Sequence, residues 1–283
     1  MNITLLSENS GKLLWPLTNG VREAQFLKLL PGDISLAERT VAALRKEYPG
    51  ARITFAAPQS QVDSIRSQFG EDVDITLIPE DAEAPAHDKT LSDLTCWENL
   101  ADEMNGKSRG MVTQENTTNT LAINELGIPL VALGTKDLII AATPDGILVS
   151  DKAASSAIAP IAEKLEQPRP MYEERRWGEY TVLAQKEHCL VKHLFIAAGK
   201  SISLQAHNHR SEVWIITKGE GSFTLDEKTW TVKPGDVLKI EIGQKHKMAG
   251  ITDLHFTEVQ LGDRFDESDI IRFDLSSDGV DLK

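Results

Sequence analysis

The chain has 283 residues, too many for one ordinary core of about 100 to 150 residues and enough for two. With 41% hydrophobic and 26% charged residues, its composition is that of a globular protein and not of a disordered chain. The formal net charge of -13 opposes binding to nucleic acid or to an anionic membrane, since both are polyanions that would repel the protein. We therefore expect a small molecule as the ligand.

The sequence contains no pattern of a membrane or secretory segment. No apolar run approaches the roughly 20 residues that cross a bilayer, and the first residues lack the basic start and long apolar stretch of a signal peptide. Cys96 and Cys189 are far apart in sequence and have no CxxC partner, so a disulfide framework is not indicated. We expect a cytoplasmic protein with reduced thiols.

Short apolar runs alternate with helical patterns along the first 80 residues. Strand and helix patterns follow one another at residues 3–6, 36–48, 51–58, 62–70 and 73–79. This order is typical of a parallel α/β unit, which we expect over residues 1–105.

The pattern changes to short β runs after residue 110. These runs end at glycines or at a Pro-Asp-Gly turn, and an alanine-rich helical pattern follows at 155–165. The next segment is polar and carries two prolines, so we place a linker near residues 167–175. Residues 106–168 are thus expected to form a β-rich segment that ends in a helix.

Beyond the linker, residues 169–283 contain many short strand patterns. Tight turns separate them at TKGEG, LDEK, KPGD and IGQK. Short strands at this spacing predict an all-β barrel or sandwich.

Metal-binding side chains gather in the stretch SLQAHNHR of this third segment. Gln205, His207 and His209 occupy every second position, so a strand would direct all three to one face. Glu212 follows closely, and His246 lies further along. One amide oxygen, two imidazoles and one carboxylate suit one divalent ion, with Zn2+ as first choice and Co2+, Mn2+ or Ni2+ as alternatives. His209 stays open as a ligand, a catalytic group or a wall of the site.

The spacing of these residues resembles the two sequence motifs of cupins, which fold as jelly-roll barrels. Gln205, His207 and Glu212 follow a glycine at the spacing of the first motif, with Gln205 in its first histidine position. The second motif resembles residues 235–250 and contributes His246. The resemblance implies a cupin barrel with these four side chains as metal ligands.

Three longer stretches resemble the mannose-6-phosphate isomerase domain of bifunctional mannose-1-phosphate guanylyltransferase/mannose-6-phosphate isomerases, the type II phosphomannose isomerases. They are RRWGEY at 175–180, the segment 191–221, and EVQLGDRFDESDIIRFD at 258–274. The chain departs from that domain at Arg176, where the family has proline, and at Val213, where it has histidine.

This resemblance implies an aldose–ketose isomerase that converts mannose 6-phosphate to fructose 6-phosphate and feeds GDP-mannose and polysaccharide precursor synthesis. In that chemistry a metal ion polarises a carbonyl and so acidifies the C2 proton, which a base moves through a cis-enediol. His209 and Glu212 are candidates for the base or a relay. Lys192 and Arg210 are candidates for binding the phosphate or the developing oxyanion.

The N-terminal half resembles the guanylyltransferase part of the same enzymes. Residues 7–30 are similar to its start, and residues 130–154 to its β-helical segment. Leu13 stands where the family has its catalytic arginine, Ala24 where it has its lysine, and Glu8 where it has a glycine. These substitutions remove groups that would approach and neutralise a triphosphate.

A long segment of the family is also missing between Pro85 and Leu91, where this chain has five residues and the family holds most of its sugar-binding half. The segment SDLTCWENL resembles the part of the family that carries its second Mg2+-binding aspartate, which would correspond to Asp93. We therefore expect that nucleotidyl transfer is lost, by substitution and by deletion. The degenerate nucleotidyltransferase-like half would then serve as a scaffold or as the contact surface of a homodimer.

Two other functions stay open. The first is a non-catalytic sugar-phosphate-binding or assembly protein, built from two decayed enzyme domains, which would bind its ligand without turnover. The second is retained mannose-1-phosphate guanylyltransferase activity, which would release pyrophosphate from GTP and mannose 1-phosphate.

Restoring the two missing charges should not restore nucleotidyl transfer. The double variant Leu13→Arg with Ala24→Lys regains the family's cations but not the segment that binds the sugar. Incubation with GTP and mannose 1-phosphate, followed by a pyrophosphate assay, should give no signal above that of the unmodified chain. Formation of GDP-mannose would contradict the argument from the deletion.

Overall fold

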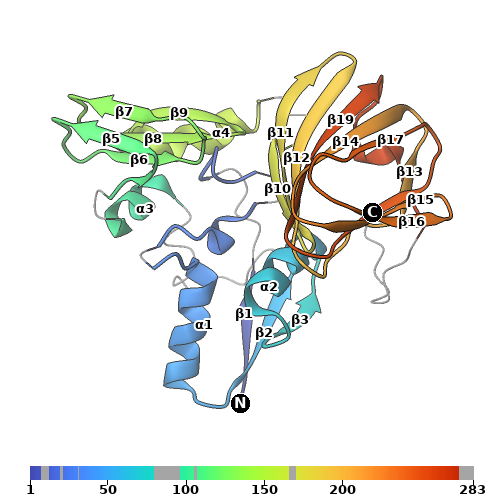
Figure 1. The fold of residues 1–283 in the computed structure, drawn as a ribbon. Coiled ribbons are helices and arrows are strands. Elements are labelled where there is room, and N and C mark those ends of the chain that lie inside the picture. Colours follow the sequence, from blue (N-terminus) through green and yellow to red (C-terminus); the bar gives the residue numbers. More distant parts are fainter. Residues whose placement is uncertain are drawn as a thin grey trace. The chain divides into compact units, whose positions relative to one another are not determined.

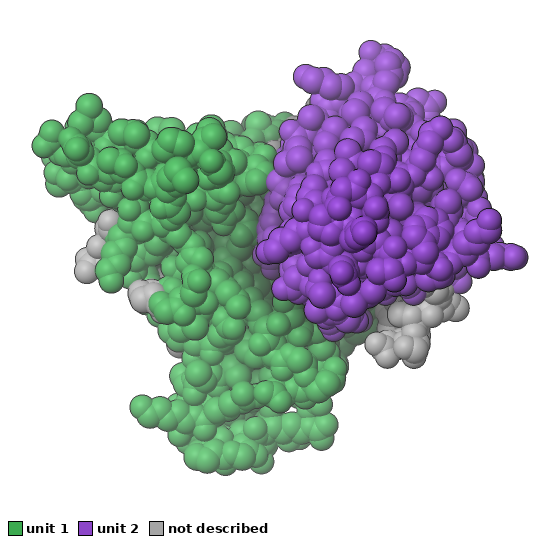
Figure 2. All heavy atoms as spheres, in the orientation of Figure 1, with its two compact units in different colours: residues 1–170 green, residues 171–283 purple. Residues whose placement is uncertain are grey.

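A computed structural model of the chain describes residues 1–7, 13–19, 22–30, 32–79, 96–104, 107–165 and 170–273. The chain divides into two compact units, Met1–Pro170 (unit 1) and Met171–Lys283 (unit 2), coloured separately in Figure 2. Glu8, Asp93 and the short stretch between Pro85 and Leu91 lie outside the described residues. Within the described part of the chain, no helix has the length and apolar character needed to span a bilayer.

Unit 1 begins with the α/β arrangement predicted from the sequence (Figure 1). Three parallel strands lie in the order β1-β2-β3, with α1 in the connection from β1 to β2 and α2 in the connection from β2 to β3. The ring of Phe55 on the central strand lies 5.3 Å from that of Phe69 on the second helix. The elements are β1 (Asn2–Leu6), α1 (Leu36–Glu47), β2 (Arg52–Ala57), α2 (Val62–Phe69) and β3 (Asp74–Leu77).

Helix α1 begins at a capping box. The Ser35 hydroxyl accepts a hydrogen bond from the backbone N–H of Glu38 (3.0 Å), and the Glu38 carboxylate accepts one from the N–H of Ser35 (2.7 Å). Two donors at the start of the helix are thus satisfied. Ala37 and Val41, four residues apart on one helix face, are buried in the same core as Phe55.

The next segment of unit 1 is a short β-helix. Two of its parallel strand pairs have the same interval, with Val112 opposite Leu130 and Leu121 opposite Ile139, whereas its last two strands pair antiparallel. Asn116 has a positive φ of 53°, the left-handed conformation that lets the chain turn sharply between two strands. The strands are β4 (Arg109–Gly110), β5 (Val112–Glu115), β6 (Leu121–Asn124), β7 (Leu130–Leu133), β8 (Leu138–Thr143) and β9 (Gly146–Asp151), followed by α4 (Ile158–Ala162).

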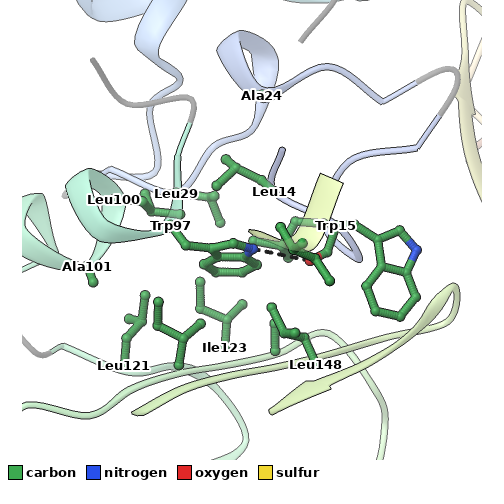
Figure 3. Close-up of a cluster of buried hydrophobic side chains, with 14 of the residues drawn as sticks. Leu14, Trp15, Ala24, Leu29, Trp97, Leu100, Ala101, Leu121, Ile123 and Leu148 are labelled. Atoms are coloured by element: carbon green, nitrogen blue, oxygen red, sulfur yellow. Dashed lines mark hydrogen bonds between the residues drawn. The ribbon is translucent and has the colours of Figure 1, made fainter. Parts of the chain in front are cut away.

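One apolar core joins residues that are far apart in the sequence of unit 1 (Figure 3). Trp97 on α3 (Trp97–Glu103) is 1% exposed, and its Nε1 donates a hydrogen bond to the carbonyl oxygen of Trp15 (3.2 Å). The same core takes side chains from the segment after β1 and from the β-helix: Leu14, Leu29, Leu121, Ile123 and Leu148. The division of this region at residue 105 stays a prediction.

Two positions that the resemblance aligns with cations of the transferase differ in environment. Ala24 is 8% exposed and belongs to the same core as Trp97, whereas Leu13 is 39% exposed. A lysine at position 24 would therefore place a charge among apolar side chains, which is costly without a partner. Ala24 suits the packing of this unit.

Replacing Trp97 with alanine should lower the free energy of unfolding of unit 1 by about 3 to 5 kcal/mol, because it leaves a large cavity in the core. The matched control is Ile128→Ala, since Ile128 is 64% exposed and its loss should cost no more than about 0.5 kcal/mol. Scanning calorimetry of the full chain measures both variants. An unchanged unfolding transition in Trp97→Ala would refute the core assignment.

Unit 2 is the all-β barrel predicted from the sequence (Figure 1). It has two antiparallel sheets, of strand orders β10-β11-β12-β19-β14-β17 and β16-β15-β18-β13-β20. Their apolar faces form one core. The strands are β10 (Tyr172–Arg175), β11 (Gly178–Lys186), β12 (Cys189–Ile196), β13 (Gln205–His207), β14 (Arg210–Lys218), β15 (Gly221–Leu225), β16 (Lys228–Val232), β17 (Val237–Ile240), β18 (His246–Gly250), β19 (Leu254–Gly262) and β20 (Ile270–Arg272).

The interior of the barrel changes from apolar to polar along strand β19. Its buried positions alternate, as expected for a strand with one face in a core. Phe256 lies opposite Leu194 and Ile216, so this level of the barrel is apolar. The two next buried positions of β19 are Glu258 and Gln260, which open a polar region inside the barrel.

Candidate metal centre

Three buried side chains from three strands converge in the polar region of the barrel. His207 ends β13, Glu212 lies near the start of β14, and His246 begins β18. One ligand atom from each lies within 4.8 Å of the others, and we call this group the His–Glu–His cluster. Nε2 of His207 is 3.1 Å from one carboxylate oxygen of Glu212, and Nε2 of His246 is 3.5 Å from the other. Two imidazoles and a carboxylate around one point are a typical metal-binding set.

Both imidazole rings direct the same nitrogen towards Glu212. Nδ1 of His207 lies 3.3 Å from the carbonyl oxygen of Asp269, and Nδ1 of His246 lies 3.0 Å from that of Gln244. A carbonyl oxygen only accepts hydrogen bonds, so Nδ1 of each ring carries a hydrogen, and Nε2 is the nitrogen that would meet a metal ion bound at Glu212. Nε2 of His246 is buried without a hydrogen-bond partner, a cost that a bound cation would remove.

The charges in the cluster also suit a cation. Burial raises the pKa of Glu212, but the hydrogen bond and charge of His207, with the charges of His246 and Arg210, lower this pKa by more, to below its usual range. Burial lowers the pKa of His246. An ionised carboxylate and neutral imidazoles are the forms that bind divalent metals.

Gln205, the fourth predicted ligand, lies beside the cluster. It is directly opposite His246 in the pairing of β13 with β18, and opposite residues direct their side chains to the same face of a sheet. Its side-chain oxygen accepts a hydrogen bond from the hydroxyl of Ser203 (3.3 Å). The position favours Gln205 as a ligand, and this role stays a proposal.

His209 lies away from the cluster, which corrects the expectation of one shared strand face. Strand β13 ends at His207, so the alternation that would have turned His209 inwards stops before it. Nδ1 of His209 lies 3.7 Å from a carboxylate oxygen of Asp263, and its side chain is 44% exposed. Together with Asp263 and His188 it lines an open surface depression.

Arg210 and Lys192 are both buried in the polar region. The Arg210 guanidinium donates to Glu212 from Nε and to Asp269 from Nη1, at 3.1 Å each. Lys192 places Nζ 3.9 Å from a carboxylate oxygen of Glu258. In this structure the two cations thus face carboxylates, and the expectation that they bind phosphate stays a proposal.

The sequence analysis missed three polar residues of the interior, Glu258, Gln260 and Asp269. Nε2 of Gln260 donates to one oxygen of Glu212 (3.1 Å), and the Asp269 carboxylate accepts from the backbone N–H of Asn208 (3.0 Å). The available signal was EVQLG, where two polar residues continue the alternation of buried Leu254 and Phe256.

Val213, where the related domain has histidine, points out of the barrel. Its neighbours Glu212 and Trp214 are buried on the inner face of β14, so the alternation of the strand directs Val213 to the other face. The substitution therefore removes no group from the His–Glu–His cluster.

Comparison with known proteins finds a family that this unit resembles. Residues 163–275 match the family model described as mannose-6-phosphate isomerase C-terminal. The resemblance predicted from the motifs is thereby confirmed for this part of the chain.

The curated relatives also cover unit 1. The chain is 25% identical over 284 residues to a mannose-1-phosphate guanylyltransferase of Escherichia coli K12, an alignment that covers 94% of this chain and 56% of the relative. Mannose-1-phosphate guanylyltransferase 2 of Escherichia coli O157:H7 is 32% identical over 194 residues, with 64% and 40% covered. The chain thus spans about half the length of these relatives.

A solved cupin superfamily protein from Desulfitobacterium hafniense DCB-2 is 23% identical to this chain, with a TM-score of 0.29. The match covers 37% of this chain and 89% of that protein.

The variants His207→Ala and His246→Ala should each abolish stoichiometric binding of a divalent metal, because each removes one imidazole of the cluster. His209→Ala should keep the metal, since the His209 side chain faces Asp263. Metal analysis by mass spectrometry on proteins equilibrated with Zn2+ measures the three stoichiometries. Unit 2 should still unfold cooperatively in each variant, because a domain of about 110 residues buries its own core.

Gln205→Ala serves as the comparison for the fourth ligand and should also lose metal. If His209→Ala loses the metal while Gln205→Ala keeps it, the ligand set is wrong and His209 replaces Gln205.

Proposed function

We propose that this protein is a metal-dependent isomerase of a phosphorylated hexose, which converts mannose 6-phosphate to fructose 6-phosphate. The observation that carries the proposal is the buried His–Glu–His cluster inside a barrel of the isomerase C-terminal family. The unpartnered Nε2 of His246 and the ionised Glu212 support one divalent cation at this point. Zn2+ is the first choice for such donors, ahead of Co2+, Mn2+ and Ni2+.

The chain would contribute binding and proton transfer to this reaction. A bound divalent ion supplies a Lewis acid that polarises the sugar carbonyl. Gln205, His207, Glu212 and His246 would hold the ion. Among the catalytic candidates from the sequence, Lys192 and Arg210 are the cations inside the barrel that would bind phosphate or the oxyanion.

The structure bears on the two candidates for the base, Glu212 and His209. Glu212 accepts hydrogen bonds on both carboxylate oxygens, from Arg210 and from Trp214, and so is better suited to hold the ion. His209 lies at the surface depression, from which it would act only at the edge of the site.

We also propose a cytoplasmic homodimer that feeds GDP-mannose synthesis without performing the nucleotidyl transfer itself. The names of the relatives support the link to GDP-mannose. Ala24, buried where the family has a lysine, supports the loss of the transferase chemistry.

A non-catalytic sugar-phosphate-binding protein is the second candidate. The pairing of Arg210 with two carboxylates favours it over the isomerase, because a guanidinium neutralised in this way has less charge to offer a developing oxyanion.

Incubation of the purified chain with mannose 6-phosphate and Zn2+ or Co2+ should produce fructose 6-phosphate, and NMR measures its appearance. The His246→Ala variant is the matched control and should give no product, because it lacks a proposed ligand. If calorimetry shows that the sugar phosphate binds, and NMR shows no turnover with any of the four metals, the second candidate is the function.

A further inference from the structure

A second buried carboxylate lies inside the barrel next to the His–Glu–His cluster. Glu258 on β19 is 4% exposed and lies directly opposite Lys192 on β12 and Trp214 on β14. It is on the same face of the strand as Phe256 and therefore points into the barrel. A carboxylate at such a position is rarely buried without a partner.

One amide connects this carboxylate to the cluster. Nε2 of Gln260 donates to an oxygen of Glu258 (2.7 Å) and to an oxygen of Glu212 (3.1 Å). Because both hydrogens leave one nitrogen, the two carboxylates lie on either side of it. Glu258 therefore adjoins the His–Glu–His cluster through Gln260 without being one of its three members.

Lys192 is the cation nearest to Glu258 in the interior. Its Nζ is 3.9 Å from a Glu258 oxygen, longer than a hydrogen bond, and 4.7 Å from the ring centre of Tyr180. The ammonium thus stabilises the ionised form of Glu258 without binding its oxygen tightly.

The other buried ionisable groups around the cluster are already engaged. The Glu212 oxygens accept from Arg210, Gln260 and Trp214, and the Asp269 carboxylate accepts from Arg210. Both cluster histidines hold Nδ1 against a carbonyl and direct Nε2 towards Glu212.

Glu173, a further buried carboxylate, pairs with Arg175 (2.6 Å) and accepts the hydroxyl of Tyr180. Among the described residues of the interior, Glu258 is thus the carboxylate beside the cluster that holds neither a guanidinium nor a proposed metal.

Opposing effects act on the pKa of Glu258. Burial raises its pKa to about 7, with a contribution from the charge of Glu212, while Lys192, Arg210 and His207 act in the opposite direction. A general base is most effective when its pKa lies near the working pH.

We propose that Glu258 is the base that carries the proton between C2 and C1 of the sugar phosphate, which rests on the proposed isomerase function. The cluster itself is fully buried, so a substrate that reaches it enters the same interior into which Glu258 points. Lys192 then keeps the carboxylate ionised for the first step.

The proposed step is balanced without a co-reactant. The Glu258 carboxylate takes the proton from C2 of the open-chain aldose, the C–H electron pair forms the C1=C2 bond, and the carbonyl pair moves to O1. The proton of the O2 hydroxyl moves to O1. The O–H electron pair that stays on O2 forms the C2 carbonyl. Glu258 returns its proton to C1 as the double-bond pair forms the new C–H bond.

Glu258→Gln tests the inference, because the amide keeps the size of the side chain and still accepts a hydrogen bond from Gln260 but cannot take up a proton. Turnover of mannose 6-phosphate, followed by NMR in D2O, should fall by about 100 to 10,000-fold, and solvent deuterium should no longer enter the sugar. Metal stoichiometry and the unfolding temperature should match the wild type. Glu258→Asp should recover part of the activity, and the exposed Glu227→Gln should behave as wild type.

Failure of the inference differs from failure of the function. Turnover of Glu258→Gln within a few-fold of an active wild type would overturn the inference and leave the isomerase. Loss of metal or of stability in Glu258→Gln, without recovery of activity by Glu258→Asp, would make the residue structural and also overturn the inference. An inactive wild type would overturn the isomerase and the inference together.

Discussion

The buried carboxylate of Glu212 organises the interior of the barrel. Removing a carboxylate from water costs several kcal/mol unless hydrogen bonds and opposite charges replace the lost hydration. The side chains that replace it come from four strands, β13, β14, β18 and β19: His207, Arg210, Trp214, His246 and Gln260. Since β13 and β18 belong to one sheet and β14 and β19 to the other, this single charge links both sheets.

Trp214 connects the polar region to the apolar core. Its ring lies 5.5 Å from Phe223 and 4.9 Å from Phe256, while its edge contacts the ring of His246 at 84°. The indole N–H donates to Glu212 (3.0 Å). The apolar packing of one rigid ring thereby fixes the orientation of two cluster members, and the precision of the site depends on the core beneath it.

Strand alternation explains both what the sequence predicted and what it missed. The α/β order of unit 1 and the all-β character of unit 2 followed from periodicity and spacing, and the convergence of His207, Glu212 and His246 followed from the resemblance to the cupin motifs. His209 was placed with them because alternation was extended past the end of β13, and a strand end depends on pairing partners that one sequence does not reveal. Glu258 was missed because an acidic residue in a strand usually faces solvent, and only the pairing with Lys192 and Trp214 places it inside.

The two units differ in whether the residues proposed for the chemistry also stabilise the fold. In unit 1 the segment after β1 keeps its apolar residues in a core with Trp97, and this core includes Ala24, whereas Leu13 is exposed. Charges that act on a triphosphate contribute little to such a core, so the fold can outlast the activity. In unit 2 the same residues serve both purposes, because Glu212 is at once a proposed ligand and the charge that the surrounding donors compensate. Replacing Glu212 would therefore remove a proposed ligand and also leave buried donors without an acceptor, which ties the stability of the barrel to this carboxylate.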